Sequence, residues 1–437
     1  MRDSGSELKA PPAAGDTDHG RLPAADDEPP REGELEPDHD PDHGRIPGPA
    51  SPDPAATSPP PADPADPADP GGPPSDAEVI RHTLDHIEPV ADKVTSYFYA
   101  LLFIHYPETR EMFPGAMDIQ RDRLFKALLA AGRYADDTAR LGELLGHLGR
   151  GHRKFGTRPE HYPAVGRCLI AALTYYAAEV WSEEAEAAWV RVYSAISQIM
   201  IDAADEDERS SPAWWLGEII AHEQRSSDIA VLTVRPDQPY GYTPGQYAAV
   251  ETPWWPRVWR HYSFAAAPRA DGLLTFHVRA IPAGWVSTAL VRRARPGDVL
   301  RLGPPCGSMT VDHTTDSGLL CLGGGTGIAP IRAMVEDVAR HGVAREMEVF
   351  YGARREVDLY DLDNLRRFER AHPWLTVRPV IGGLPEAVSQ CGPWAAYEAY
   401  LSGPLPMIRT GVRMLTASGV PVRHIRHDDL ENLTPPP

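Results

Sequence analysis

The spacing of apolar residues changes twice along this chain, and no single fold class accommodates all three patterns. Between residues 75 and 207 apolar side chains recur at spacings of three and four, which predicts amphipathic helices. Residues 216–310 alternate apolar and polar side chains in short runs broken by Pro and Gly, which predicts a small antiparallel barrel. From Leu319 onward, apolar runs alternate with helical stretches, which predicts a parallel sheet with crossover helices.

Individual strands are predicted from these runs. The expected strands of the barrel are Ile229–Val234, Tyr247–Glu251, Leu274–Ile281 and Val299–Leu302. Those of the parallel sheet are Leu319–Leu322, Met347–Tyr351, Leu375–Ile381 and Tyr400–Leu401. In the helical part, Ser75 and Glu78 predict a capped first helix, another helix is expected from Thr157 to about Trp181, and a last one from Glu183 to about Ala204. We therefore expect an all-α domain over 76–208, a barrel over 209–312 and an α/β domain over 313–437.

Residues 1–75 follow none of these patterns. They hold 19 of the 46 prolines, and their 17 acidic and 5 basic side chains supply −12 of the net charge of −19. Few of them are large and apolar, so the segment buries too little surface to offset the entropy of ordering. We interpret it as a disordered tail rich in Pro and Asp, with partner docking as the alternative.

Composition excludes several classes of function. The rest of the chain carries a net charge of about −7 without a basic face, so we expect no nucleic-acid partner. No apolar run reaches the ~20 residues that span a bilayer. The four cysteines are widely spaced, which indicates reduced thiols rather than disulfides or an iron–sulfur site. A cytoplasmic monomer is the expectation.

The helical domain contains an ordered set of residues around one histidine. Tyr99 in FYALLF, Phe113, Gln120 in IQRDRLF, His152 in GHRKFGTRPEHY and the PAVG of residues 163–166 follow one another over about 130 residues. This order resembles the globin domain of flavohaemoglobins, in which a globin is fused to an FAD- and nicotinamide-dependent reductase. Without that context His152 would be read as a solvated or core histidine.

The resemblance implies roles for these residues. His152 is the expected proximal ligand of haem b iron, and Tyr162 and Glu206 are expected beside it, where a carboxylate makes the imidazole a stronger donor to iron. On the distal side, Tyr99 is expected to donate a hydrogen bond to oxygen, with Gln120 supporting it. Phe113 and Leu124 are expected to line the haem pocket. A polar helix end is the alternative for Glu206.

Two motifs in the barrel resemble the flavin site of the ferredoxin–NADP reductase superfamily. In the motif WRHYS, Arg260 is expected to pair with the FAD pyrophosphate and Tyr262 to stack on the isoalloxazine. Ser263 is expected to hydrogen-bond near the flavin N5. The second motif, GWVST, looks like a phosphate-binding turn at Gly284. The expected FAD residues of the two motifs and the preceding strand are Tyr247, Arg260, His261, Tyr262, Ser263, Gly284, Val286 and Ser287.

A glycine-rich turn follows the run Leu319–Leu322 and precedes a helical stretch. Such a turn lets the backbone approach a pyrophosphate, and the helix dipole favours the negative charge. With Ser402-Gly403-Pro404 after a later strand, it resembles the nicotinamide site of the same superfamily. Arg354 and Arg355 leave NADH and NADPH both open, with NADH slightly favoured. The expected nicotinamide-binding residues are Gly325, Thr326, Gly327, Ile328, Ala329, Pro330, Gly403 and Pro404.

Three residues depart from the family pattern, and all of them lie on the expected electron path. Gly151 stands where a lysine commonly precedes the proximal histidine, and Ser402 where a cysteine usually precedes the Gly-Pro. Asp428, expected to face the flavin, replaces a glutamate. The flavin-to-haem transfer rate is therefore the part of the analogy that these residues put in question.

The resemblance implies a nitric oxide dioxygenase. Electrons would pass from NADH or NADPH through FAD to haem, where nitric oxide and oxygen become nitrate. The gaseous substrates are then the expected partners. Two alternatives stay open: a haem-linked reductase acting on peroxides or quinones, and a globin gas sensor. A sensor usually carries a signalling output domain, and the sequence contains no such pattern.

Overall fold

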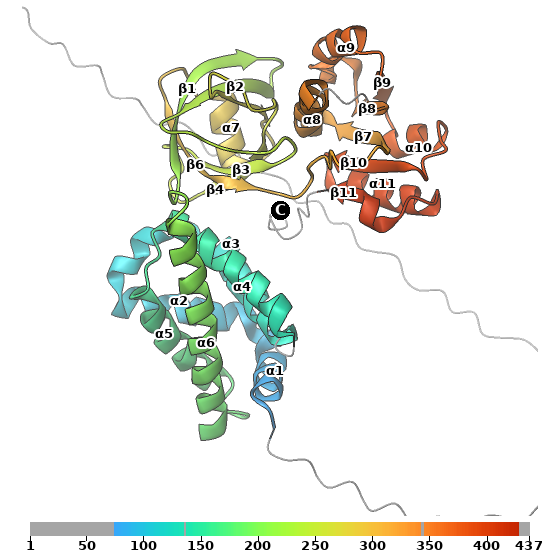
Figure 1. Cartoon of the computed structure of the whole chain (residues 1–437). Helices are drawn as coiled ribbons and strands as arrows, with labels where there is room; N and C mark the ends of the chain where they lie inside the picture. Colours follow the sequence, from blue (N-terminus) through green and yellow to red (C-terminus); the bar gives the residue numbers. More distant parts are fainter. Residues whose placement is uncertain (1–73, 135–136, 342–344, 428–437) are drawn as a thin grey trace, which may run out of the picture. The chain divides into compact units, whose positions relative to one another are not determined.

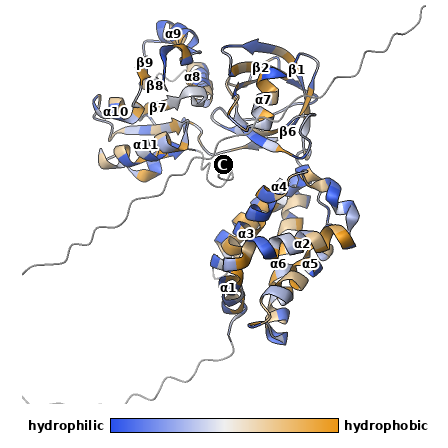
Figure 2. Ribbon diagram, turned by 180° about the vertical axis from the view of Figure 1, so that it is seen from behind, coloured by the Kyte–Doolittle hydropathy of each residue, from blue (hydrophilic) through white to orange (hydrophobic). Residues whose placement is uncertain are grey.

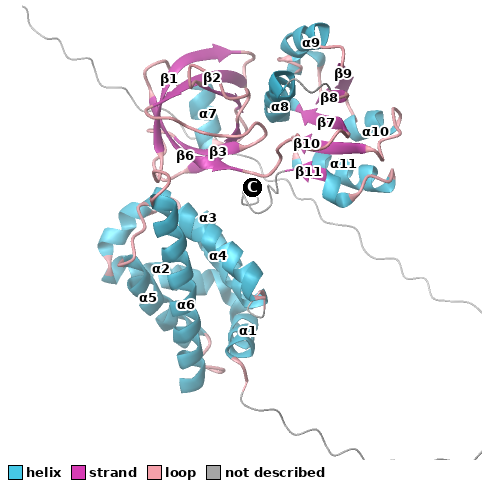
Figure 3. Ribbon diagram, in the orientation of Figure 1, coloured by secondary structure: helices cyan, strands magenta, loops and turns pink. Residues whose placement is uncertain are grey.

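A computed structural model describes residues 74–134, 137–341 and 345–427 (Figure 1). The predicted succession of fold classes is confirmed: helices come first, then an antiparallel sheet, then a parallel sheet with helices (Figure 3). The predicted tail of residues 1–75 lies almost wholly outside the described residues. The longer helices of the first domain are α1 (Asp76–Ile87), α2 (Ala91–His105), α3 (Asp118–Arg133), α4 (Thr138–His152), α5 (His161–Tyr176) and α6 (Glu183–Glu208).

The helix boundaries follow local capping chemistry. Ser75 and Glu78 form the predicted capping box of α1, and the Ser182 side chain accepts a hydrogen bond from the Ala185 amide at the start of α6. The helix predicted from Thr157 begins only at His161, because Pro159 lies in a turn before it, and it ends at Tyr176 rather than near Trp181. Orange and blue patches alternate along the helical ribbons in Figure 2, as amphipathic helices require.

Helices α4 and α6 approach each other closely at one glycine. A Cβ atom built on Gly149 would lie 2.2 Å from the carbonyl oxygen of Met200, far inside van der Waals contact. Only glycine allows this approach, and Gly149 precedes His152 by one helical turn. The approach therefore sets where His152 lies relative to the C-terminal half of α6.

The second domain is built on one antiparallel sheet. Its strand order is β4-β3-β6-β1-β2-β5, and a bridge between Phe264 and Phe276 joins the two ends of that order, so the sheet curls into a barrel. Helix α7 (Trp285–Arg292) packs against β2 and β5. Strands β1 and β4 were not predicted. The strands are β1 (Trp215–Gln224), β2 (Ile229–Pro236), β3 (Tyr247–Glu251), β4 (Trp259–Ser263), β5 (Leu274–Arg279) and β6 (Val299–Cys306).

The third domain is a parallel sheet covered on both faces. Its order is β11-β10-β7-β8-β9, and successive residues of β7 enter different cores: Leu319 packs with helix α8, whereas Leu320 packs with α10 and α11. This two-sided burial explains the continuous apolar runs. The elements are β7 (Gly318–Gly324), α8 (Ile328–His341), β8 (Met347–Ala353), α9 (Leu362–Ala371), β9 (Leu375–Ile381), α10 (Leu384–Ser389), β10 (Tyr397–Ser402), α11 (Leu405–Ala417) and β11 (Ile425–His427).

Buried polar contacts join the barrel to the parallel-sheet domain. The Ala267 amide donates to the Glu336 carboxylate on α8 at 3.0 Å, and the His277 Nδ1 and the Tyr360 hydroxyl share a hydrogen bond of 2.8 Å. Burial, followed by the nearby Arg332, lowers the pKa of His277 to about 3, so this ring is neutral at physiological pH. In the described part of the chain, none of the helices is both long and apolar enough to cross a membrane.

The α4–α6 approach makes a stability prediction with an internal control. Gly149→Ala forces the two helices apart and should lower the free energy of unfolding of the helical domain by about 1–3 kcal/mol. Gly142→Ala lies in the same helix, where a Cβ meets nothing within 4 Å, and should instead raise stability by about 1 kcal/mol through helix propensity. Urea unfolding followed by circular dichroism measures both. Equal effects of the two substitutions would contradict the packing argument.

Candidate functional site

His152 ends α4 and lies in the wall of a cavity of about 660 Å³. Its Nδ1 atom is buried and has no hydrogen-bond partner in the described structure. Burial, followed by the nearby Lys154, lowers the pKa of His152 to about 4, so the ring is held neutral. A neutral imidazole with an unsatisfied buried nitrogen is costly unless it meets a ligand or a partner that this cavity can hold.

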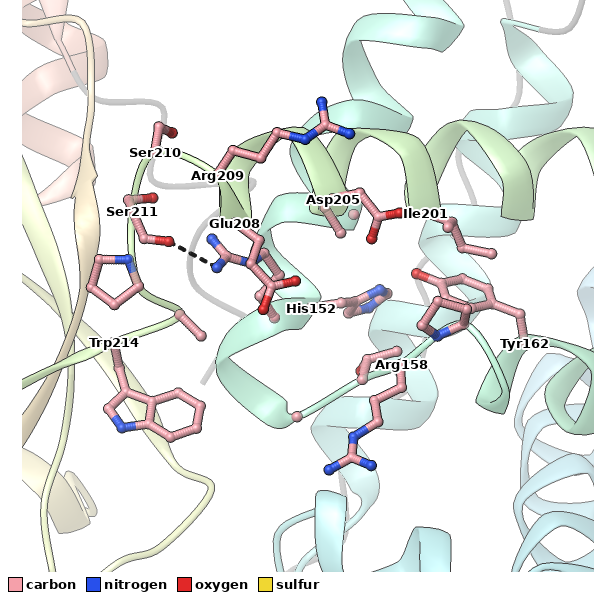
Figure 4. A pocket seen from close by; sticks show the side chains of 18 of the residues that line it. His152, Arg158, Tyr162, Ile201, Asp205, Glu208, Arg209, Ser210, Ser211 and Trp214 are labelled. Carbon is pink, nitrogen blue, oxygen red and sulfur yellow. Dashed lines mark hydrogen bonds between the residues drawn. The ribbon is translucent and has the colours of Figure 1, made fainter.

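Helices α5 and α6 supply the side chains around His152. Tyr162 comes from the first turn of α5, and its backbone carbonyl accepts a 2.8 Å hydrogen bond from the Tyr193 hydroxyl. Asp205 and Glu208, three residues apart on one face of α6, line the same cavity. Figure 4 shows the Tyr162 hydroxyl turned toward the His152 ring, with the two carboxylates on the other sides of it.

The structure does not bring Glu206 to this cavity. Glu206 is absent from the lining residues, because it points about 100° away from its neighbour Asp205 around the helix; Asp205, Glu206 and Glu208 are all exposed. The carboxylates that share the cavity with His152 are those of Asp205 and Glu208. The run Asp205-Glu206-Asp207-Glu208 offers four acidic residues in sequence, so only the helix phase distinguishes them.

Asp207 has a structural role beside this site. Its carboxylate pairs with the buried Arg153, and Arg153 also donates to the Ser211 carbonyl at 2.8 Å. These contacts tie the residue after His152 to the end of α6 and to the segment leading into the barrel. The position of His152 is thus held from both sides, by Gly149 before it and by Arg153 after it.

Tyr99, Phe113, Gln120 and Leu124 form a second group in the helical domain, and none of them lines the His152 cavity. The Tyr99 hydroxyl donates to the backbone carbonyl of Gln120 at 3.4 Å, a long and therefore weak bond. The Tyr99 and Phe113 rings meet edge to face with centroids 5.4 Å apart. Burial holds the pKa of Tyr99 well above its usual range, so its hydroxyl keeps its proton.

The WRHYS motif forms β4, which pairs with β3. Tyr247 lies opposite Ser263, and its ring centroid is 5.0 Å from that of His261. The Arg260 guanidinium donates to the Trp259 carbonyl at 2.8 Å. Burial first, and then the cations Lys154, Arg123 and Arg260, lower the pKa of His261 to about 3. Such a gathering of positive charge suits an anionic ligand like a pyrophosphate. For Tyr262, burial raises the pKa.

The GWVST motif forms the turn into α7. Gly284 caps this helix, and a Cβ on it would lie 2.4 Å from the Ser287 Oγ. That hydroxyl donates to the Gly284 carbonyl and accepts from the Ile281 amide, so it closes the turn. Val286 is buried. The first amides of α7 have no acceptor within the helix, which leaves donors for a phosphate.

The glycine-rich turn packs against the turn after β10. Gly325, Thr326 and Gly327 form a short 3₁₀ helix, and a Cβ on Gly327 would lie 2.3 Å from the Ser402 carbonyl oxygen. Gly403 adopts a φ of 150°, with its own Cβ position 3.1 Å from the Gly324 Cα. The two turns therefore touch backbone to backbone. The side chains of Ile328, Ala329 and Pro330 are buried in the core, whereas Pro404 is exposed as the N-cap of α11.

The structure adds cations that sequence reasoning missed. The Arg279 guanidinium lies 3.2 Å from the Cβ position of Gly325, at the glycine-rich turn, and it pairs with Asp228 at 2.8 Å. In the sequence, Arg279 could have been recognised as a candidate from its position five residues before the predicted phosphate-binding turn at Gly284. Lys154 lies over the Trp259 ring, 5.5 Å from its centroid. Arg355 pairs with Asp358 and Arg354 is exposed. Asp428 lies outside the described residues.

Comparison with known families divides the chain in the same way. Residues 96–200 match the globin family, residues 217–311 the oxidoreductase FAD-binding domain, and residues 321–391 the oxidoreductase NAD-binding domain. The chain is 27% identical over 391 residues to a flavohemoprotein of Chromobacterium violaceum, covering 80% of this chain and 96% of that protein.

Two further relatives share parts of this arrangement. The ferredoxin–NAD(P)+ reductase component of a naphthalene 1,2-dioxygenase system from Pseudomonas putida is 31% identical, over 48% of this chain and 67% of its own length. The crystal structure of a flavohemoglobin from Malassezia yamatoensis, with bound FAD and heme, matches with a TM-score of 0.67 at 18% identity, covering 81% of this chain and 98% of that one. This structural match shows a shared fold.

The contact between the two glycine turns predicts a local effect on nucleotide binding. Gly327→Ala should push the Ser402 turn away and raise the dissociation constant for NADH roughly tenfold, a change of about 1.4 kcal/mol. Titration calorimetry of the full chain measures it. Gly241→Ala, where a Cβ meets nothing within 4 Å, is the control. Unchanged NADH binding in a folded Gly327→Ala variant would exclude this turn as the nucleotide site.

Proposed function

The chain belongs to the flavohaemoglobin family and is an NAD(P)H-dependent oxidoreductase, and from this premise we propose that it is a nitric oxide dioxygenase. In this proposal it converts nitric oxide and oxygen to nitrate. Electrons come from NADH or NADPH through FAD to haem, and each hydride supplies two successive turnovers. The substrates are small gases, and the protein's contribution is to hold the cofactors and tune their surroundings.

One observation carries the haem part of the proposal: the unsatisfied, buried Nδ1 of His152 in a cavity shared with Tyr162 and Asp205. Among the described residues there is no group of three or more His, Cys, Asp or Glu that could hold a bare metal ion, so a metal held by protein ligands alone is not supported. A single neutral imidazole suits haem, which brings its own equatorial nitrogens. Haem held by His152 would supply the redox-active iron at which oxygen and nitric oxide react.

The residues beside His152 would tune its basicity. Binding of one ring nitrogen to iron leaves the other to donate its proton to a neighbour. Asp205, which shares the cavity, is the carboxylate we propose for this proton, in place of Glu206. Negative charge there raises the electron density that the imidazole donates, which favours oxygen activation over storage. We propose that the Tyr162 hydroxyl, which is turned toward the same ring, helps to orient it.

The Tyr99 group would serve the substrate side. The hydroxyl keeps its proton, and its bond to the Gln120 carbonyl is long, so it can rotate to donate to a polar substrate atom. Phe113 and Leu124 would limit the volume around it. A donor fixed in a water-poor core stabilises developing negative charge more than it would in water.

The reductase residues divide between two cofactors in this proposal. Arg260 and the first amides of α7 would bind the FAD pyrophosphate, and Tyr262 and Ser263 the flavin ring. The backbone of Gly325–Gly327, with Arg279 beside it, would bind the nicotinamide dinucleotide. Gly151 leaves open space where a Cβ meets nothing within 4 Å, so the lysine common in the family is absent for reasons other than steric exclusion.

The proposal predicts nitrate formation by the purified full chain. After anaerobic reduction with NADH, addition of oxygen and then nitric oxide should produce nitrate while the haem spectrum cycles. His152→Ala should lose most of its haem, retain FAD and form no nitrate. Full haem occupancy in His152→Ala would exclude the ligand assignment. Wild-type protein that consumes peroxides or quinones but makes no nitrate would favour the alternative reductase function.

Asp205 and Glu206 point in different directions around α6, so substitutions at the two positions should have different effects. Asp205→Asn should weaken haem binding or nitric oxide turnover by about 10- to 100-fold, because it removes the proton acceptor beside His152. It should also lower the iron–histidine stretching frequency of the ferrous protein, measured by resonance Raman spectroscopy. Glu206→Gln, one residue on and outside the cavity lining, is the matched control and should change neither. The reverse result would restore Glu206 to this role.

A further inference from the structure

Two tryptophans of the barrel are exposed, although large aromatic side chains are usually buried. Of the ten tryptophans in the chain, Trp255 and Trp285 are the two whose surface is substantially open, 38% and 49% exposed. Their rings stack on each other, with centroids 4.9 Å apart and planes inclined by 25°. The neighbouring Ile281 is 57% exposed. Exposed apolar surface that is gathered in one patch commonly marks a binding site.

The backbone beside each of these tryptophans is strained. Among the described residues, Arg257 and Ala283 are the two that adopt a positive φ without being glycine, at 66° and 57°. Arg257 follows Trp255 by two residues, and Ala283 precedes Trp285 by two. Strained backbone of this kind persists only where surrounding contacts hold it, and it clusters at ligand sites.

Hydrogen bonds hold both strained turns in place. The Trp255 amide donates to the Thr252 carbonyl at 3.2 Å, and the Arg257 amide donates to the buried Glu251 carboxylate. On the other side, the Gly284 amide donates to the Ile281 carbonyl at 3.0 Å. These bonds hold the backbone that carries the two stacked rings, and a preorganised backbone lowers the entropic cost of binding a flat molecule.

The tryptophan pair adjoins both groups proposed for the FAD pyrophosphate. Trp285 is the first residue of α7 and directly precedes Val286 and Ser287. The loop that carries Trp255 leads into β4, on which Arg260 lies. The stacking of Trp255 on Trp285 therefore links the loop before β4 to the start of α7, the two elements proposed for the pyrophosphate.

We propose that the outward faces of Trp255 and Trp285 form a stacking platform for the adenine of FAD. The purine offers a flat π face, and stacking on an exposed indole requires no hydrogen-bond readout. The inference rests on the proposed function, because it takes FAD to be the cofactor of the barrel. In this proposal the adenine of FAD covers Trp255 and Trp285, which are exposed in the protein without FAD.

The test compares two flavins that differ in the part the platform would bind. FMN lacks the AMP half of FAD, so it probes the flavin site without the platform. Full-length apoprotein is titrated with FAD and with FMN, following flavin fluorescence, for the wild type and for Trp255→Ala and Trp285→Ala. We expect each substitution to weaken FAD binding about 10- to 100-fold and to leave FMN binding within about twofold.

Two further variants control for structural effects. Trp285→Phe keeps an aromatic face and should retain most of the FAD affinity. Leu216→Ala removes a comparably exposed apolar side chain, 43% exposed, on β1 of the same domain and should change neither flavin.

Each remaining outcome overturns a stated claim. Equal losses of FAD and FMN affinity would make the pair a structural support of the flavin site. Unchanged affinity for both flavins would exclude adenine and leave the patch as a surface for another protein. A wild-type chain that binds neither flavin would overturn the proposed function itself, and the adenine platform with it.

Discussion

The close approach of α4 to α6 at Gly149 is the contact on which the candidate haem site depends. A side chain at this position would collide with the Met200 carbonyl and separate the two helices. One helical turn later, the same approach presents His152 to the face of α6 that carries Asp205 and Glu208. Glycine at this position costs about 1 kcal/mol of helix stability relative to alanine. The close helix packing that it allows places the His152 imidazole.

In the barrel and the parallel-sheet domain, charged side chains mark the candidate cofactor sites. Burial first, and then Lys154, Arg123 and Arg260, keep His261 neutral beside β4, and Arg279 lies at the glycine-rich turn. The negative charge of the proposed pyrophosphate would offset this local positive charge. At the boundary between the barrel and the parallel sheet the balance is different. There the Glu336 carboxylate accepts from the Ala267 amide and pairs with the Arg332 guanidinium, which ties the barrel to α8.

Strain and exposure concentrate in the same small part of the barrel. The turn at Gly284 and the loop at Arg257 both deviate from ordinary backbone geometry, and each presents a tryptophan to solvent. In the barrel core, by contrast, Phe264 and Phe276 are fully buried. Departures from local preference that are not explained by packing are expected at functional sites, and this contrast is why the tryptophan pair carries the further inference.

The succession of fold classes can be predicted from the amino-acid sequence alone, because hydrophobic periodicity is a local property of each segment. The sequence also located His152, the WRHYS motif and the glycine-rich turn, since each is a contiguous string. Strand β4 escaped prediction because its residues are only partly buried and do not alternate. Which carboxylate of Asp205–Glu208 meets His152 depended on the phase of α6 after its packing against α4. The approach of Arg279 to Gly325, and that of Trp255 to Trp285, join residues that are far apart in the chain. These contacts could not be predicted from local patterns, because they arise from the packing of elements that are distant in the sequence.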